Sequence, residues 1–317
     1  MQKLFIAIDL GGTKCAGAAI TESGRIKYKT KDKITGLTGI EVSKMIYSMI
    51  TKLTDMFSSS FQVSGVGISV PGISNQEEGT VWAPNIPGWD NYPLMADLRA
   101  RLSPSLAIHI DSDRACSICG EAWLGVAKGR KNAIFLAFGT GIGAGILIDG
   151  KVLRGKSDIA GAIGWMALDH YYPDGYAQFG CFEYNASGDG LVRLSKDIYL
   201  QKEINTSMVM ENIHAEDIFK AYDQQDPLAL ETIRAAIDYW AKAVANLVSI
   251  FNPEIIVFGG GVFGPGLKLL NRIYERSKKW AQPVAIKEVR LVGGQLGADA
   301  QLLGAARLVM DKEKQSI

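Results

Sequence analysis

Residues Leu4 to Ile20 read LFIAIDLGGTKCAGAAI, and this stretch decides the fold. An apolar run that carries Asp9 near its end leads into a turn at Gly11–Lys14, and a second run of small and apolar residues follows. This is the pattern of a β-hairpin, because Gly-Gly is one of the pairs that can adopt the positive φ values of a two-residue turn. Exposed N–H groups at such a turn, together with the Thr13 hydroxyl, can hold phosphate oxygens, and Asp9 could hold a phosphate-bound metal ion.

The same pattern recurs near the middle of the chain, where Ala133 to Gly150 reads AIFLAFGTGIGAGILIDG. Its turn again places a threonine between glycines, at Gly139, Thr140 and Gly141. One such turn alone is explained as well by glycines that only reverse the chain. Two copies indicate a duplicated fold that closes on one nucleotide from two sides.

Composition predicts a globular protein with two domains. The chain has 317 residues, of which 47% are apolar and 21% charged, and its net charge is +1. Lysine and arginine are dispersed, so no nucleic-acid partner is expected. No apolar run approaches the roughly 18 residues of a membrane helix, and the N-terminus does not resemble a signal peptide. We therefore expect a cytoplasmic protein without a membrane partner.

The four cysteines agree with a reducing compartment. Cys15 and Cys181 stand alone, whereas Cys116 and Cys119 form a C-x-x-C inside a helical pattern. A redox or zinc role for that pair remains an alternative, but there is no second C-x-x-C to complete a zinc site.

The first half of the chain reads as an α/β domain. Apolar residues at helical spacing predict a helix over 40–57, and GVGISV predicts a strand over 65–70. The next segment, 84–94, has the composition of an irregular surface loop, where binding groups often lie. Its specific side chains are Asn85, whose amide suits a sugar hydroxyl, and Trp89, whose indole could stack on a sugar ring. The alternative for both is turn formation and packing.

A strand over 106–110 leads into Asp111, Ser112 and Asp113, and a helix continues to Gly125. Ser112 is the expected N-cap. Asp113 could simply complement the helix dipole, or it could be a base, because a side chain at the end of this strand points into the cleft between the two halves.

The second half repeats the plan. After a long loop region over 155–190, helices are expected over 191–200 and 216–222 and from Pro227, with Asp226 as the cap of the last. A strand over 254–258 then runs into Gly259–Gly264, which formally matches the dinucleotide fingerprint of a dehydrogenase. Too few residues remain for a dinucleotide-binding domain, and the ribose-binding acid is missing, so a glycine-floored adenosine pocket is the better interpretation. A final helix over 295–310 is expected to cross back to the first domain.

Together these motifs resemble the ROK family of sugar kinases, within the actin and hexokinase superfamily, over nearly the whole chain. The matching segments are DLGGTK (9–14), PNIPGW (84–89), SD (112–113), GEAWLG (120–125), FGTGIGAGILIDGKVLRG (138–155), GCFEYNASG (180–188), NPEIIVFGGGV (252–262) and LGADAQLLGAA (296–306). The resemblance implies an α/β, two-domain actin/hexokinase-like (ribonuclease H-like) fold with ATP and sugar in the interdomain cleft. The expected domains are 1–112 plus about 300–317, and 113–299.

The resemblance also implies ATP-dependent phosphorylation of a sugar hydroxyl, with Asp113 accepting the hydroxyl proton and with Mg²⁺ near Asp9. The implied ATP-binding residues are Asp9, Gly11, Gly12, Thr13, Lys14, Gly139, Thr140, Gly141, Gly260, Gly261 and Val262. The candidate sugar-binding residues are Asn85, Trp89, Ser112, Asp113, Trp165 and Glu183. Family resemblance further suggests a homodimer.

One departure from the family pattern concerns the substrate. Where the family usually reads E-x-G-H, this chain has Ala162, Ile163, Gly164 and Trp165. A sugar-contacting glutamate and a zinc-binding histidine are thereby lost, and of the family's cysteine cluster only Cys181 remains, so we predict no structural zinc. Losing a buried acceptor disfavours a substrate by a factor on the order of 10⁴. We therefore expect a glycoside, a keto-sugar or a cyclitol or inosose rather than plain glucose.

Two alternatives stay open at this point. A neighbouring side chain, from Asp158, Asp169 or His170, could supply the lost acceptor in an ordinary glucokinase. The protein could also be a non-catalytic sugar sensor, since the family contains repressors. Those repressors carry an N-terminal helix-turn-helix domain, whereas the phosphate hairpin here begins at residue 4.

Overall fold

The computed structural model describes residues 1–315 and divides the chain into two compact units. Unit 1 comprises residues 1–129, 154–160 and the chain from 295 onward, and unit 2 comprises residues 130–153 and 161–294. The chain therefore passes between the units at four places.

Each unit contains a five-stranded sheet, and the two sheets share one topology. The order is β3-β2-β1-β4-β7 in unit 1 and β10-β9-β8-β11-β12 in unit 2. In both sheets the first three strands along the chain pair with one another in antiparallel fashion, and the last two strands extend the sheet beyond the first strand in parallel. This repetition confirms the duplicated α/β fold that the two hairpins predicted. The strands of unit 1 are β1 Gln2–Leu10, β2 Lys14–Thr21, β3 Ile26–Lys33, β4 Phe61–Val70 and β7 Ala107–Ser112, and those of unit 2 are β8 Ala133–Phe138, β9 Ile142–Ile148, β10 Lys151–Val152, β11 Ile255–Gly259 and β12 Arg290–Gly293.

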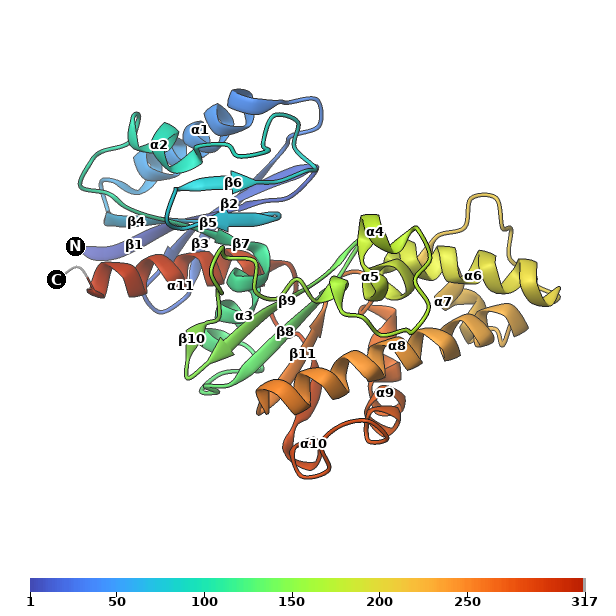
Figure 1. Cartoon of the computed structure of the whole chain (residues 1–317). Coiled ribbons are helices and arrows are strands. Elements are labelled where there is room, and N and C mark those ends of the chain that lie inside the picture. Colours follow the sequence, from blue (N-terminus) through green and yellow to red (C-terminus); the bar gives the residue numbers. More distant parts are fainter. Residues whose placement is uncertain (316–317) are drawn as a thin grey trace. The chain divides into compact units, whose positions relative to one another are not determined.

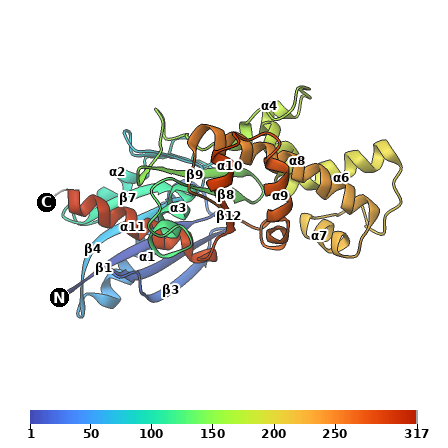
Figure 2. The same cartoon turned by 90° about the horizontal axis from the view of Figure 1, so that it is seen from below.

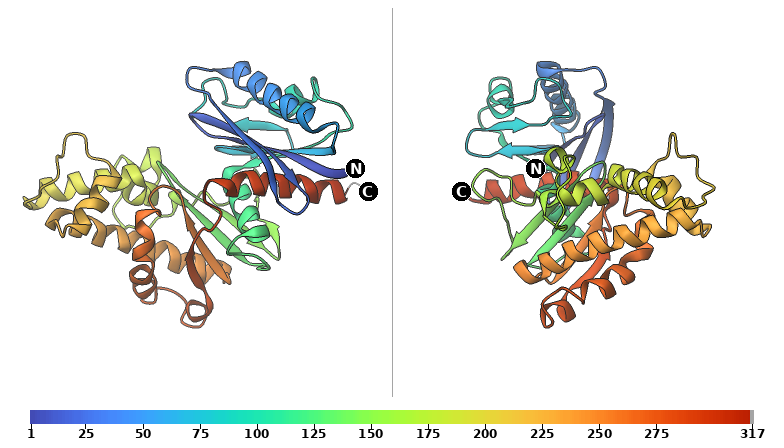
Figure 3. Two further views of the ribbon diagram at one scale, coloured as in Figure 1. Left: turned by 180° about the vertical axis from the view of Figure 1, so that it is seen from behind. Right: turned by 45° about the vertical axis from the view of Figure 1, so that its right-hand side comes forward.

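In unit 1 the two faces of the sheet bury different helices. Alternate residues of a strand point to opposite faces, so Leu4, Ile6 and Ile8 pack in one apolar cluster with helix α1 (Gly39–Phe57). Phe5 and Ala7 pack in another cluster with α11 (Ala300–Gln315). The helices thus cover opposite faces of the sheet, which lies between α1 and α11 in Figure 1 and in the left view of Figure 3. The remaining elements of unit 1 are β5 Ile73–Asn75, β6 Thr80–Trp82, α2 Leu94–Arg99, α3 Asp113–Leu124 and η3 Gly297–Asp299.

The core of unit 2 is organised around α8 (Pro227–Phe251), whose stripe of Ile233, Trp240 and Val244 is fully buried with the sheet residue Phe138. Asp226 caps this helix by accepting hydrogen bonds from Leu228 N and Ala229 N, as predicted. Helices α6, α7 and α8 pack on one another (Figure 2). The other elements are η1 Ile163–Trp165, α4 Tyr176–Phe179, α5 Cys181–Ala186, α6 Gly188–Lys202, α7 Ala215–Asp223, η2 Pro265–Leu269, α9 Leu270–Ser277 and α10 Ala285–Glu288.

The units divide the chain differently from the expected domains 1–112 and 113–299, because α3 and the segment 154–160 belong to unit 1. Helix α3 stays in unit 1 because α11 packs directly on it. A side chain at Gly120 of α3 would meet the Ala300 carbonyl, and one at Gly304 of α11 would meet the Cys116 carbonyl. These two glycines therefore allow the backbones of α3 and α11 to pack closely. The last helix, α11, is assigned to unit 1 together with the first hairpin.

None of the helices described within residues 1–315 is both long and apolar enough to cross a membrane.

Candidate active site

The β1–β2 turn forms the first candidate phosphate site. Leu10 pairs with Cys15, and Gly11 N donates to Lys14 O at 2.8 Å, so Gly12 and Thr13 lie at the tip of the turn. Neither Gly11 nor Gly12 has a positive φ, which corrects the predicted turn mechanism. The glycines provide open backbone instead, since Gly12, Thr13 and Lys14 are exposed. This exposed peptide can offer its N–H groups to an anion.

Acidic and hydroxyl side chains gather where the parallel strands of unit 1 end. Strand register places Asp9 beside Ser69 and Ser69 beside Asp111. Ser69 Oγ donates to Asp9 Oδ1 at 2.9 Å. Burial raises the pKa of Asp9 to about 6; the bond from Ser69 acts against this shift, and the negative charge of Asp113 adds to it. Asp9 and Asp113 are thus close enough to interact electrostatically.

Asp113 is the first residue of α3, and Ser112 is its N-cap. Ser112 Oγ accepts from Ala115 N at 3.3 Å, which confirms the predicted cap. The Asp113 side chain is 40% exposed, and Arg114 Nε lies 3.8 Å from Asp113 Oδ1. Burial raises the pKa of Asp113, and the Arg114 charge opposes this shift. A carboxylate with a raised pKa is a better proton acceptor than an ordinary aspartate.

The loop over 84–94 brings one of its two predicted side chains near the first turn. A side chain placed on Gly12 would lie 3.6 Å from Asn85 Cβ, so Asn85, which is exposed, borders the turn. Trp89 is fully buried, its ring is stacked on Tyr92 at 4.9 Å between centroids, and its Nε1 donates to Gly39 O at 3.0 Å. The structure therefore corrects the predicted sugar-stacking role of Trp89, because both ring and N–H are used in the core.

The second turn, Gly139–Gly141, joins β8 to β9 in unit 2. Gly139 N donates to Gly141 O at 3.0 Å, and Gly188 N donates to Gly139 O at 2.8 Å, so the start of α6 supports the turn. Glu183 lies behind it, where Glu183 Oε2 accepts from Ile142 N at 2.7 Å. Burial raises the pKa of Glu183, although the Ile142 amide acts against this shift. The other oxygen, Oε1, has no donor among the residues that the structure describes.

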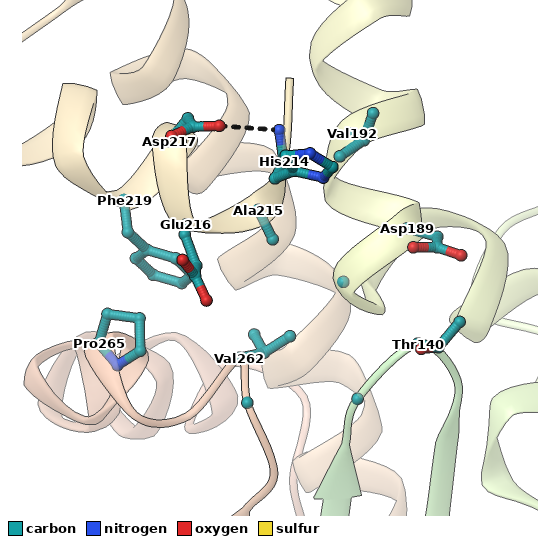
Figure 4. A pocket seen from close by; sticks show the side chains of 13 residues that line it. Thr140, Asp189, Val192, His214, Ala215, Glu216, Asp217, Phe219, Val262 and Pro265 are labelled. Carbon is teal, nitrogen blue, oxygen red and sulfur yellow. Dashed lines mark hydrogen bonds between the residues drawn. The ribbon is translucent and has the colours of Figure 1, made fainter. Parts of the chain in front are cut away.

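A cavity of about 400 Å³ opens beside this second turn (Figure 4). Thr140 lies at one end, Val262 and Pro265 lie on the floor, and α7 contributes the Phe219 ring and the Glu216 carboxylate. The described lining of the cavity contains no lysine or arginine. Because the charged side chains of this described lining include carboxylates and no cation, the cavity is poorly suited to a triphosphate, whereas Val192, Phe219 and Val262 offer apolar surface for a flat ring.

Glycine is required at the floor of this cavity. Gly260 has φ +88°, and a side chain there would collide with the Phe138 carbonyl. Val262 N donates to Phe138 O at 3.1 Å, which fixes the chain after β11 against β8. Gly261 faces open space and lines the cavity with Val262. The predicted residues Gly139, Thr140, Gly261 and Val262 thus share one cavity.

The loop that departs from the family pattern lies in unit 2. Trp165 ends the short helix η1 and is 58% exposed, so its indole is available to a ligand. A side chain at Gly164 would lie 3.0 Å from Glu183 Oε2, so η1 packs directly on Glu183. Cys181 is buried, and Leu168 N lies 3.4 Å from Cys181 Sγ. Within residues 1–315, no group of three or more His, Cys, Asp or Glu side chains is arranged to hold a metal ion.

Two of the three proposed substitutes for the lost glutamate, Asp158 and Asp169, already accept hydrogen bonds within the protein. Asp158 Oδ2 accepts from Gln76 N at 2.9 Å in unit 1. Asp169 accepts from Tyr239 O–H at 3.0 Å and from His170 N at 2.8 Å. The His170 side chain is 99% exposed. Both carboxylates thus already have hydrogen-bond donors within the protein.

The predicted residues fall into two groups. In unit 1, Asp9, the first turn, Asn85, Ser112 and Asp113 all lie toward the C-terminal ends of the parallel strands. In unit 2, the second turn, Glu183, Trp165 and the glycines after β11 surround η1 and the cavity. Sequence reasoning missed Ser69, Arg114 and Glu216. Ser69 could have been found, because it is a polar residue one position before the end of the strand predicted over 65–70.

Comparison with known proteins agrees with this arrangement. The family model described as "ROK family" matches residues 5–312. A glucokinase of Thermotoga maritima is 31% identical, with 98% of this chain and 99% of that protein covered. An N-acetyl-D-glucosamine kinase of Salmonella newport is 28% identical, over 96% of this chain and 99% of that protein. The solved structure of a ROK family glucokinase from Streptomyces griseus, in complex with glucose and AMPPNP, is similar with a TM-score of 0.76 and 29% identity, covering 97% of this chain and 99% of that one. The chain therefore belongs to the ROK family.

Proposed function

We propose that this protein is an ATP-dependent kinase that phosphorylates a hydroxyl of a hexose-like polyol other than plain glucose. The observation that carries the kinase assignment is the presence of two glycine-threonine turns, one in each of two units of the same topology, and of Asp113 at the start of α3, directly after the parallel strand β7. The ATP-binding and sugar-kinase activities of the family members named above support it.

Phosphoryl transfer depends on positioning of the reactants and on charge neutralisation rather than on covalent catalysis. The turns at Gly11–Thr13 and Gly139–Gly141 would hold the phosphates through backbone N–H groups. The cavity beside Val262 would hold the adenosine. Asp113 would accept the proton of the attacking hydroxyl, and Asn85 and Glu183 would hold the sugar.

Asp9 fits a role in holding Mg²⁺. Its carboxylate offers the hard oxygen donor that this ion prefers, and it is oriented by Ser69 at 2.9 Å. The mutual repulsion of Asp9 and Asp113 is the kind of charge imbalance that a cation relieves. When bound with ATP, the ion would neutralise charge on the phosphates.

The substrate proposal depends on the sugar-facing loop. Ala162 offers a methyl group where the family usually has a carboxylate, and Trp165 presents an exposed indole. Because Asp158 and Asp169 are already hydrogen-bonded, we infer that the acceptor is lost rather than moved. A glycoside, keto-sugar or cyclitol lacks, or has altered, the hydroxyl that such an acceptor would bind.

A coupled assay for ADP release across sugars, glycosides, keto-sugars and cyclitols tests the proposal. We expect turnover with at least one atypical acceptor and a much lower kcat/KM with glucose. No turnover with any acceptor, together with tight binding of one of them, would instead identify a sensor.

A gain-of-function variant sharpens the substrate test. Ala162→Glu restores the carboxylate and should raise kcat/KM for glucose at least tenfold. Ala167→Glu, an exposed position of the same loop, is the matched control and should leave glucose turnover unchanged. A wild-type enzyme that already prefers glucose would refute the substrate proposal while leaving the kinase assignment intact.

A further inference from the structure

An ion-pair cluster lies two residues before Asp113. Asp111, which is 2% exposed, is the penultimate residue of β7 in unit 1. Arg154 reaches it from the segment after β10 and forms a bidentate pair, with Nη2 at 2.7 Å from Asp111 Oδ2 and Nη1 at 3.1 Å from Asp111 Oδ1. His109 Nε2 lies 3.1 Å from the same carboxylate. A bidentate arginine fixes a carboxylate in both distance and plane.

The Asp111 carboxylate also accepts a hydrogen bond from the turn that leads to Asp113. Asp111 Oδ1 accepts from Ser112 N at 2.9 Å, and Ser112 in turn caps α3. The Asp113 carboxylate itself has only the Arg114 guanidinium, at 3.8 Å, as a charged partner in the described chain. The direction of Asp113 therefore depends on the backbone of this turn.

Arg154 also organises its own segment, residues 154–160, which belongs to unit 1 although the chain on either side belongs to unit 2. Arg154 Nη1 lies 3.4 Å from Asp158 Oδ1, and Asp158 Oδ2 accepts from Gln76 N at 2.9 Å. Arg154 O accepts from Ala160 N at 3.1 Å, which closes the segment into a loop. One guanidinium thus joins this loop to the end of β7.

We propose that Arg154 is a positioning residue for the phosphoryl transfer, and that its bidentate pair with Asp111 fixes the turn from which Asp113 meets the acceptor hydroxyl. This inference rests on the proposed kinase function. Geometry of this kind affects kcat strongly, because a displacement of about 1 Å in a reacting group can cost 10²-fold in rate. The nucleotide cavity lies in unit 2 and uses no residue of the cluster, so nucleotide affinity should not change.

The test compares three variants with the wild type by steady-state kinetics and thermal unfolding, using the best acceptor of the panel. Arg154→Met should lower kcat at least 30-fold, leave the KM for ATP within threefold, and lower Tm. Arg154→Lys should regain part of the Tm but stay at least tenfold below wild type in kcat, because an ammonium cannot form the bidentate pair. Asp111→Asn combined with Arg154→Met should regain Tm, because no unpaired buried charge remains, yet kcat should stay low.

The matched control is Arg101→Met in the same unit. Arg101 Nη2 pairs with Asp97 Oδ1 at 2.6 Å and is 23% exposed, against 30% for Arg154. This control should lower Tm with kcat unchanged. The inference is overturned if Arg154→Met keeps kcat within threefold, if kcat returns together with Tm in the double variant, or if Arg101→Met lowers kcat as much. Absence of wild-type turnover with every acceptor would contradict the proposed function itself, and this inference with it.

Discussion

A buried glutamate at the end of α3 gives the most quantitative prediction. Glu121 is fully buried, and its carboxylate accepts three backbone N–H groups: Val126 N at 3.0 Å on Oε2, and Gln295 N at 2.9 Å and Leu296 N at 3.0 Å on Oε1. Gln295 is the first residue of the last segment of unit 1. Glu121 therefore anchors the chain where it leaves unit 2 and returns to α11.

The perturbation is Glu121→Gln, which keeps the size of the side chain. The amide oxygen can still accept from Gln295 and Leu296, but the NH₂ group then faces the Val126 N–H, donor against donor. Losing a hydrogen bond to a charged group costs about 1.5–3 kcal/mol, and the two remaining bonds become neutral and weaker. We expect a total cost of about 3 kcal/mol, which corresponds to a factor on the order of 10² in a local opening equilibrium.

Hydrogen exchange measured at single amides is the suitable assay, because a two-unit protein need not unfold in one step. Protection of the Val126, Gln295 and Leu296 amides should fall about 100-fold. The matched control is Glu254→Gln: Glu254 Oε1 accepts from two consecutive amides in the same way, but its side chain is 38% exposed, so the loss there should be below tenfold. Unchanged protection of Gln295 and Leu296 in Glu121→Gln would refute the reasoning.

Three further predictions concern Trp89, Gly260 and Asp226. Trp89→Phe should lower the free energy of unfolding by about 1–3 kcal/mol, and the KM for the acceptor should stay within twofold of wild type because Trp89 is buried in the core. A tenfold rise in that KM would indicate instead that Trp89 contacts the acceptor. Gly260→Ala, at φ +88° and facing the Phe138 carbonyl, should weaken ATP binding at least tenfold in calorimetry; an unchanged Kd would argue against the nucleotide cavity. Burial acts to raise the pKa of Asp226, but hydrogen bonds from Ser207, Ala229 and Thr206 outweigh it, so the pKa in the folded protein is lowered. The Asp226 carboxylate therefore stabilises the fold fully above its unfolded pKa near 3.8, and this stabilisation is lost as the pH falls through the lower folded pKa. At pH 7 the Asp226→Asn variant should lose about 1 kcal/mol of the free energy of unfolding, and its Tm should be lower than that of the wild type. This Tm difference should shrink below pH 4, and a difference that does not depend on pH would contradict the stabilising role of the charged carboxylate.

The duplicated fold could be predicted from sequence because its signals are local. Each hairpin carries its own apolar runs and turn, and Asp226 followed by Pro227 marks the start of α8 without reference to any distant residue. Asp113 could be placed for the same reason, since a strand pattern ends and a capped helix begins at Ser112. Both the sheets and Asp113 could therefore be predicted from patterns of neighbouring residues along the chain.

The features that sequence could not predict depend on contacts between distant segments. Trp89 lies in a loop of ligand-binding composition, but its burial depends on Tyr92 and on the Gly39 carbonyl. The Arg154–Asp111 pair joins positions 43 residues apart, and no local pattern marks either residue as a partner. The Gly11–Gly12 turn shows a further limit, because neither glycine adopts the positive φ that Gly-Gly allows, and a side chain at either position would contact Lys14 O or Asn85 Cβ.

The central claim is that Asp113 accepts a proton from a hydroxyl that attacks ATP. The measurement that tests it most directly is ADP release by wild type and Asp113→Asn with the best acceptor of the panel, together with calorimetric binding of that acceptor to both proteins. The account predicts that the variant binds the acceptor within threefold of wild type while kcat falls about 10²–10⁴-fold. Wild-type turnover in Asp113→Asn would contradict it.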